Sequence, residues 1–213
     1  MTTSTRGKAR GPYAKTAERR RDIGRAVLDL VREKGHGAVT TAEVAERAGA
    51  REATVLYHFP SKDHLLVAAL AQADEQAVEP YRVAGEPDDL LEALRNFAHI
   101  GPQRENELRL YAALAGHATT PGHPAQEYFA RHYSSAIAYF AGIVSRRQAA
   151  GLADPALDPA EVARQLVATW DGLQAQWLAD RSFDIGDLLV SAFRRLSGRD
   201  RMEDRDSGRP HRP

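Results

Sequence analysis

Cysteine is absent from the 213-residue chain, and only two methionines occur. Without cysteine there can be no disulfide scaffold, thiolate nucleophile, Cys-based zinc site or iron–sulfur cluster. No apolar run approaches the roughly 18 residues that a membrane helix needs. The polar, basic first residues also lack the apolar stretch of a secretory signal. We therefore expect a soluble, cytoplasmic protein.

Several catalytic and structural patterns are also missing. The sequence has no glycine-rich phosphate loop, no His-Glu-x-x-His and no Gly-x-Ser-x-Gly. His117 and His123 flank a probable loop, but no pair of histidines stands at helical i, i+4 spacing, so we expect no metal. No segment alternates Val, Ile or Thr as a strand would. These absences favour a protein that is not an enzyme, has no cofactor and contains no β-sheet.

The chain instead carries apolar residues at helical spacing, mostly in stretches bounded by its 11 prolines. The pattern predicts an all-α fold of about nine helices joined by short loops. The longer predicted helices fall within 23–34, 61–77, 87–100, 103–117, 125–150, 158–177 and 184–196, and two short ones within 40–48 and 52–58. Asp158 followed by Pro159, and Asp184, are typical of helix starts.

The zero net charge hides a gradient along the chain. Residues 1–64 carry 13 basic and 8 acidic side chains, net +5, whereas residues 65–198 carry 11 and 17, net −6. A basic N-terminal third on an acidic body suggests that only the first part meets a polyanion. Ordinary variation of surface charge would give the same imbalance.

Both ends of the chain have little to bury. Residues 1–15 and 199–213 are rich in polar and charged side chains, and we expect both to be disordered. A basic run reaches from the first end into the predicted first helix: Arg6, Lys8, Arg10, Lys15, Arg19, Arg20 and Arg21. It could enter a minor groove, or it could add only non-specific affinity for nucleic acid.

The pattern of residues 40–62 predicts two short helices joined by a tight turn. Thr40 and Glu43 have the spacing of a capping box. Gly49 follows the first helix, where the chain must turn sharply. Val44, Ala45, Val55 and Leu56 are the expected inner contacts. This is the geometry that lays a second helix in a DNA major groove, although a helical hairpin that serves only packing would have the same spacing.

The wider string is more specific. Residues 48–66 read Ala-Gly-Ala-Arg-Glu-Ala-Thr-Val-Leu-Tyr-His-Phe-Pro-Ser-Lys-Asp-His-Leu-Leu, which resembles the tetracycline-repressor (TetR) family of bacterial regulators. The resemblance covers residues 20–70, and a weaker pattern continues in Leu157-Asp-Pro-Ala-Glu-Val-Ala and Trp170-Asp-Gly-Leu. Two positions depart from the family: Arg51 stands where Ser or Thr is usual, and Leu56 where an aromatic is usual.

The resemblance implies an architecture and a function. It implies an N-terminal three-helix helix-turn-helix domain, which we place at residues 16–64, and a larger effector-binding and dimerisation domain at 65–198. The last two helices would form most of a homodimer interface. The expected function is sequence-specific transcriptional regulation, as a repressor released from a pseudo-palindromic operator by a small molecule. The alternative is a helical ligand-binding or interaction protein that has lost specific DNA recognition.

Chemistry assigns roles to eight side chains of the helix-turn-helix. Thr41 and Lys62 suit phosphate oxygens, although Lys62 could instead be a solvated lysine. The candidates for base edges are Arg51, Glu52, Ala53 and Thr54. Glu52 could instead stabilise a helix N-terminus. Tyr57 and His58 could bind the DNA backbone or seal the small domain, while Phe59 belongs to the core.

The body offers two further groups of candidates. Residues of different stripes that could converge on a small organic effector, or form plain core, are Phe97, His99, Tyr111, His132, Tyr133, Phe140 and Trp170. The last two predicted helices carry broad apolar stripes, and one of these would stay exposed in a monomer. The expected dimer contacts are Leu166, Leu173, Trp177, Leu188, Leu189, Ala192, Phe193 and Leu196.

Overall fold

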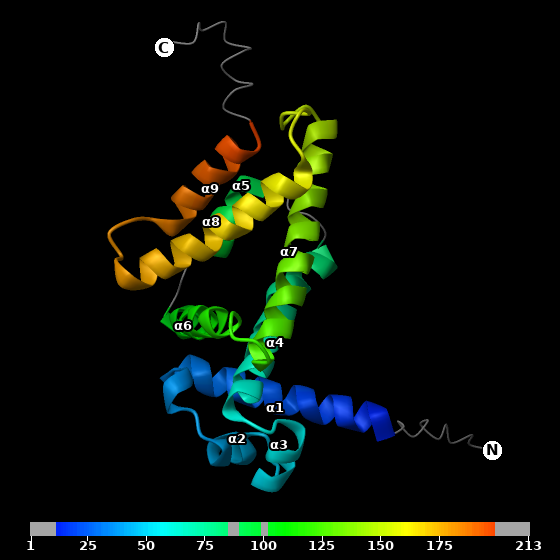
Figure 1. Ribbon diagram of the computed structural model, residues 1–213, viewed down its shortest axis with the longest axis vertical. Coiled ribbons are helices and arrows are strands. Elements are labelled where there is room, and N and C mark those ends of the chain that lie inside the picture. The colour runs from blue at the N-terminus through cyan, green and yellow to red at the C-terminus, as the bar shows by residue number, and fades with distance from the viewer. Residues whose placement is uncertain (1–11, 85–89, 99–101, 199–213) are drawn as a thin grey trace, which may run out of the picture.

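The computed structural model describes residues 12–84, 90–98 and 102–198 (Figure 1). These residues form nine α-helices and one short 3₁₀ helix, with no strand among them, so the predicted all-α fold is confirmed. In chain order the elements are α1 (Pro12–Lys34), η1 (His36–Ala38), α2 (Thr41–Arg47), α3 (Glu52–His58), α4 (Lys62–Ala84), α5 (Leu90–Ala98), α6 (Pro102–His117), α7 (Pro124–Ala149), α8 (Pro159–Ala179) and α9 (Ile185–Leu196).

The predicted helix starts have the expected caps. The Asp158 carboxylate accepts a hydrogen bond from the backbone N–H of Ala160 at 2.8 Å, and Pro159 occupies the first turn of α8. At α9 the Asp184 carboxylate accepts from the N–H of Asp187, also at 2.8 Å. These side chains satisfy donors that a helix N-terminus leaves without a partner.

Two prolines do not mark helix boundaries where the sequence pattern predicted them. Helix α1 begins at Pro12, inside the expected disordered segment 1–15, and α4 continues through Pro80 to Ala84. At the first position of a helix the missing N–H of proline costs nothing. Inside a helix it removes one backbone hydrogen bond, which can bend the helix without ending it. The remaining expected terminal segments, 1–11 and 199–213, lie outside the described residues.

Side chains of six helices share the first hydrophobic core. It joins α1 to α2, α3 and the first half of α4, and it also takes in Leu110 and Leu114 of α6 and the start of α7. The predicted boundary at residues 64 and 65 therefore falls within α4 and within a continuous core. The helix-turn-helix and the adjoining part of the body pack as one unit.

The second core lies at the other end of the molecule. It is built from α5, the second half of α7, α8 and α9. Leu166, Leu189 and Phe193 are only 1–2% exposed there. The sequence-based assignment of these three side chains to a dimer interface is therefore corrected, because the stripes of α8 and α9 cover each other and α5 within one chain. Leu173, Trp177 and Leu196 are partly buried at the edge of this core.

The helices connect the two cores along the length of the molecule. In Figure 1, α2 and α3 lie at the lower end, α8, α9 and α5 lie in the upper part, and α4 and α7 run between them. Helix α6 lies between α1 and α8 and contacts both. Within the part of the chain that the structure describes, no helix is long and apolar enough to span a membrane.

The shared first core makes a testable prediction about α6. Leu110 is fully buried between α6 and its neighbours, whereas Leu152, in the loop before α8, is 45% exposed. We expect Leu110→Ala to lower the free energy of unfolding by about 2–5 kcal/mol, because it leaves a cavity in a close-packed interior. Chemical denaturation followed by circular dichroism would measure the loss.

The matched control is Leu152→Ala, which should change the free energy of unfolding by less than about 0.5 kcal/mol. Equal effects of the two substitutions would contradict the placement of α6 in the shared core.

Candidate nucleic-acid interface

The turn between α2 and α3 has the expected local structure. The hydroxyl of Thr40 accepts from the backbone N–H of Glu43 at 3.4 Å, and the Glu43 carboxylate accepts from the N–H of Thr40 at 3.1 Å. The predicted capping box is thus confirmed. Lys34 and Thr40 also bind this carboxylate and lower the pKa of Glu43 to about 2. Gly49 has φ of +58°, a conformation that other residues rarely adopt.

Fewer side chains of α3 are buried than the sequence predicted. Val44, Ala45, Val55 and Phe59 are buried, as expected. Leu56 is 45% exposed, which corrects its assignment to the inner contacts. Val55 and Phe59 stand one turn apart and fill the inner face, while Leu56 is rotated about 100° away from Val55. The residue therefore adds apolar surface to the outer side of α3.

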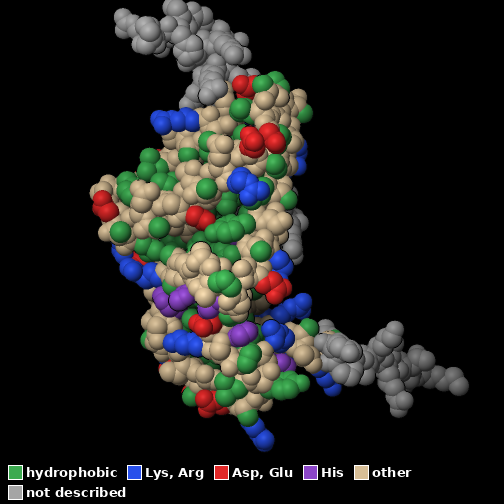
Figure 2. Space-filling view, in the orientation of Figure 1, with side chains coloured by type: hydrophobic (Ala, Val, Ile, Leu, Met, Phe, Trp, Pro, Cys, Tyr) green, Lys and Arg blue, Asp and Glu red, His purple; other side chains and the backbone are tan. Residues whose placement is uncertain are grey.

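The predicted base-reading side chains lie on the free side of the helix. Arg51, Glu52 and Ala53 are exposed, Thr54 is partly exposed, and Tyr57 is 83% exposed. Arg51 occupies the N-cap position of α3 but makes no side-chain capping bond, so its guanidinium is not used to hold the helix start. A basic side chain projects from the lower tip of the molecule, where α2 and α3 lie (Figure 2).

The two predicted phosphate ligands lie at helix starts. Thr41 is the first residue of α2 and is partly exposed. The exposed Lys62 begins α4, and its ammonium donates to the Gly37 carbonyl at 2.8 Å. Lys62 thus ties α4 to η1, a contact that the sequence did not reveal. Because an ammonium has three donors, this bond leaves two for a phosphate.

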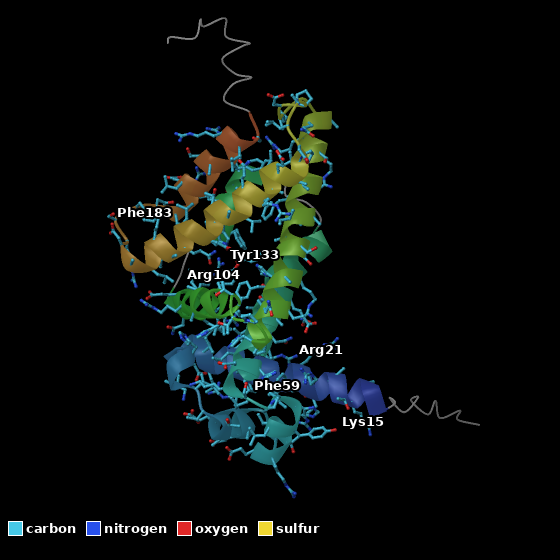
Figure 3. All side chains as sticks on the ribbon, viewed as in Figure 1. Lys15, Arg21, Phe59, Arg104, Tyr133 and Phe183 are labelled. Atoms are coloured by element: carbon cyan, nitrogen blue, oxygen red, sulfur yellow. The ribbon has the colours of Figure 1, made fainter. Side chains whose placement is uncertain are left out.

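Two arginines of the basic run brace the helix-turn-helix. Arg19 donates to the Ala48 carbonyl at 3.3 Å, at the end of α2. Arg20 donates to the His58 carbonyl at 2.5 Å, at the end of α3, and its guanidinium lies 4.3 Å from the Phe59 ring centroid. Positive charge is favourable at helix C-termini. The described Lys15 and Arg21 are exposed on the part of α1 toward its free end (Figure 3).

These arginines also influence His58. The ring is partly buried, and desolvation lowers its pKa, with smaller contributions in the same direction from Arg20 and Arg19. The free protein therefore favours a neutral His58 imidazole at neutral pH, able to donate one hydrogen bond and to accept another.

In the body, five rings from α6 and α7 form what we call the aromatic cluster. Its members are Tyr111, Tyr128, Phe129, His132 and Tyr133, and neighbouring ring centroids are 5.0–6.1 Å apart. Three of the seven predicted effector residues thus come together. Two more of the predicted effector residues, Phe97 and Trp170, contact each other, with their ring centroids 5.2 Å apart.

Two aspartates that the sequence analysis did not single out hold the aromatic cluster. Asp171 of α8 accepts from the Tyr111 hydroxyl at 3.0 Å and from the Tyr133 hydroxyl at 2.8 Å. Asp74 of α4 accepts from the Tyr128 hydroxyl at 2.6 Å. Asp171 follows Trp170 directly, so an acidic residue beside an apolar stripe was the available signal.

Burial determines the protonation of this cluster. Desolvation raises the pKa of Tyr111, Tyr128 and Tyr133, in the last case to about 12, and the neighbouring aspartates add to the rise. All three phenols therefore stay neutral and act as donors. Desolvation also raises the pKa of Asp171, against the lowering effect of its two tyrosine partners.

Other predicted effector and dimer residues lie elsewhere. Phe140 packs against the second core and contacts Tyr139 rather than the aromatic cluster, and His99 lies outside the described residues. Trp177 lines a hollow of about 310 Å³ with Arg95, Asn96 and Phe183. Leu188 is exposed on α9, and Ala192 is partly buried. His123 caps α7 and lies 3.4 Å from the Asp63 carboxylate.

Comparisons with known proteins agree with this geometry. Residues 24–69 match the family model described as bacterial regulatory proteins, tetR family. The HTH-type transcriptional repressor KstR of Rhodococcus jostii is 40% identical over 87 residues, which cover 36% of this chain and 41% of that protein. The HTH-type transcriptional regulator BetI of Escherichia coli is 32% identical over 98 residues, covering 46% and 44%.

The chain thus spans about two fifths of the length of the curated relatives it matches. A solved structure from Rhodococcus sp., assigned to the TetR-family transcriptional regulators, aligns with a TM-score of 0.67 and 25% identity, over 85% of this chain and 99% of the other. The fold therefore extends the likeness from the N-terminal helices into the body. Through residues 24–69, the chain is similar to the TetR family of bacterial regulatory proteins.

Proposed function

We propose that this protein is a homodimeric transcriptional repressor that binds a pseudo-palindromic DNA operator and leaves it when a small molecule binds the body. The observation that carries the proposal is the outer face of α3, whose polar side chains are exposed while its inner face is locked by Val55 and Phe59. Its place of action is the bacterial cytoplasm, where such DNA lies.

The proposed reading surface begins at the N-terminus of α3, the end that enters a major groove in helix-turn-helix proteins. The Arg51 guanidinium suits guanine, the Glu52 carboxylate can accept from cytosine, and the Ala53 methyl can contact thymine. Thr54 completes this set. Tyr57 and His58, one turn further on, are placed to contact the DNA backbone, together with Thr41 and Lys62.

Helix α6 is the proposed link between ligand and DNA. On one side Glu107 pairs with Arg32 of α1, and the Asn106 amide donates to the Arg32 carbonyl at 3.0 Å. On the other side Tyr111 binds Asp171 of α8. A ligand that favours one position of α6 over another therefore also biases the position of α1. Only such a difference in affinity can shift the equilibrium between two states.

The proposed dimer uses the outer faces of α8 and α9 rather than their buried stripes. Leu188 is a large apolar side chain that is 43% exposed on α9. On the outer face of α8, Ala168, Gly172 and Ala175 are exposed and small, so a second helix could approach closely. A two-fold axis here would present two α3 helices to grooves about 34–36 Å apart, or a multiple of that spacing.

The DNA proposal predicts different outcomes for two basic side chains. Fluorescence anisotropy would follow binding to DNA from upstream of the protein's own gene, with scrambled DNA as the reference, at several salt concentrations. We expect Arg51→Ala to weaken operator binding by about 1–3 kcal/mol and to relax base preference at one position. Lys62→Ala should weaken both DNAs alike and reduce the salt slope by about one unit.

Arg131→Ala, on the exposed side of α7, is the matched control and should leave both affinities unchanged. An unaltered operator affinity and base preference in Arg51→Ala would remove that residue from the reading surface. Equal, salt-sensitive binding of the unsubstituted protein to both DNAs would contradict specific recognition of this DNA and favour the alternative of a ligand-binding protein.

The dimer proposal is tested by placing a charge at its apolar contact. Leu188→Glu should convert the dimer to monomer at a fixed concentration, because two copies of an unpaired carboxylate would be buried together. Size-exclusion chromatography with light scattering measures the mass. The control is Leu152→Glu, a leucine of similar exposure outside the proposed interface. A dimer that survives Leu188→Glu would contradict the assignment.

A further inference from the structure

The polar partners of Asp171 are two phenols. Each carboxylate oxygen accepts one hydroxyl, from α6 and from α7. Among the described residues, no Lys or Arg side chain lies within ion-pair distance of Asp171. Neutral hydrogen bonds stabilise a carboxylate, but they do not cancel its charge. A partly buried anion without a cation is costly.

Asp74 gives the aromatic cluster a second carboxylate. It binds Tyr128, and the Nδ1 atom of His132 lies 3.0 Å from the same oxygen. In the described part of the chain it too has no Lys or Arg partner. Two acidic side chains, from α4 and α8, therefore bind the hydroxyls of the aromatic cluster, and His132 lies against one of them.

The rings attract positive charge, as the carboxylates do. The face of a tyrosine or tryptophan carries negative electrostatic potential and attracts cations. The described structure already contains such a contact nearby: the Arg104 guanidinium lies 5.3 Å from the Phe97 ring centroid, and it donates to the Phe97 carbonyl at 2.5 Å. Arg104 and Tyr133 both lie between α6 and α8 (Figure 3).

Access is compatible with a ligand. Tyr111, Tyr133, Trp170 and Asp171 all keep part of their surface exposed, unlike the fully covered Leu110 and Leu114 on the same side of the body. A cation beside Asp171 would gain charge–charge attraction that the two neutral phenols do not supply, and this attraction can offset the loss of a phenol hydrogen bond.

We propose that the effector of this protein is an organic cation, held by the carboxylate of Asp171 and by the ring faces of Tyr111 and Tyr133. This inference rests on the proposed function and specifies the ligand class for it. An anionic effector would meet two carboxylates and several ring faces, all unfavourable. A neutral apolar effector would leave Asp171 buried more deeply and still unpaired, which adds to its desolvation cost.

Because Tyr111 links α6 to α8 through Asp171, the same cation would compete for the bond that fixes α6. Ligand charge and the position of α6 are therefore coupled at one carboxylate. A ligand that filled space beside the rings without reaching Asp171 would leave that bond intact.

The experiment is a calorimetric titration of the full chain without DNA. The probe is phenyltrimethylammonium, whose charge is permanent, compared with its neutral carbon isostere tert-butylbenzene and with the anion phenylacetate. We expect the cation to bind at least about tenfold more tightly than either comparator, a ratio that corresponds to one decade in Kd. Asp171→Asn should reduce the affinity for the cation by about tenfold or more.

Matched variants separate the site from general stability. Glu161→Gln removes an exposed carboxylate from the first turn of the same helix and should bind the cation as the unsubstituted chain does. Thermal unfolding of each variant identifies any that fail to fold, and Asp74→Asn, which should weaken cation binding less than Asp171→Asn, then serves as the second carboxylate variant.

Three outcomes would overturn the inference: no binding of phenyltrimethylammonium, equal binding of the neutral isostere, or full affinity in both folded aspartate variants. Since the titration contains no DNA, its result is independent of operator recognition. Cation binding without specific DNA binding would support the inference and count against the proposed function. Specific DNA binding without cation binding would support the proposed function and overturn the inference.

Discussion

The burial of one hydrophobic core across the helix-turn-helix and the body is the constraint from which the rest of this structure follows. A small domain of three helices buries too little apolar surface to be stable with much margin. Here α1, α2 and α3 share their core with α4, α6 and the start of α7. Helices α2 and α3 are thus attached to the body through close packing rather than through a linker.

Polar contacts reinforce the same junction. Arg32 is bound by Glu107 through its side chain and by Asn106 through its carbonyl, so one residue of α1 is held by two of α6. Arg19 and Arg20 hold the ends of α2 and α3 against the other end of α1. Helix α1 is therefore held by polar contacts in its N-terminal half and in its last turn.

Local features were predictable from the sequence, whereas partnerships between distant helices were not. The capping box at Thr40, the turn at Gly49 and the caps at Asp158 and Asp184 depend on neighbours a few residues away, and all were predicted. The burial of Phe193 and the exposure of Leu56 depend on which stripe packs on which, a choice that periodicity alone does not make. The same limit hid Asp171, whose partners lie 38 and 60 residues away.

The arginines of the basic run differ in their structural roles. Arg19 and Arg20 follow each other directly and bind the C-terminal ends of α2 and α3, respectively, whereas the adjacent Arg21 makes no such contact and is exposed among the described residues. Counting charges treated all of them as candidates for nucleic-acid contact. The difference between structural and exposed arginines arises from their angular positions on α1, which only the packed helices define.

The separation of α3 into an inner and an outer face has an evolutionary consequence. Val55 and Phe59 fix the helix in the domain, and the exposed side chains from Arg51 to Tyr57 add little to its burial. Surface substitutions away from caps and cores usually change stability by less than about 0.5 kcal/mol. After gene duplication, descendants could therefore acquire new operators by changing the outer face alone, without compensating changes in the rest of the chain.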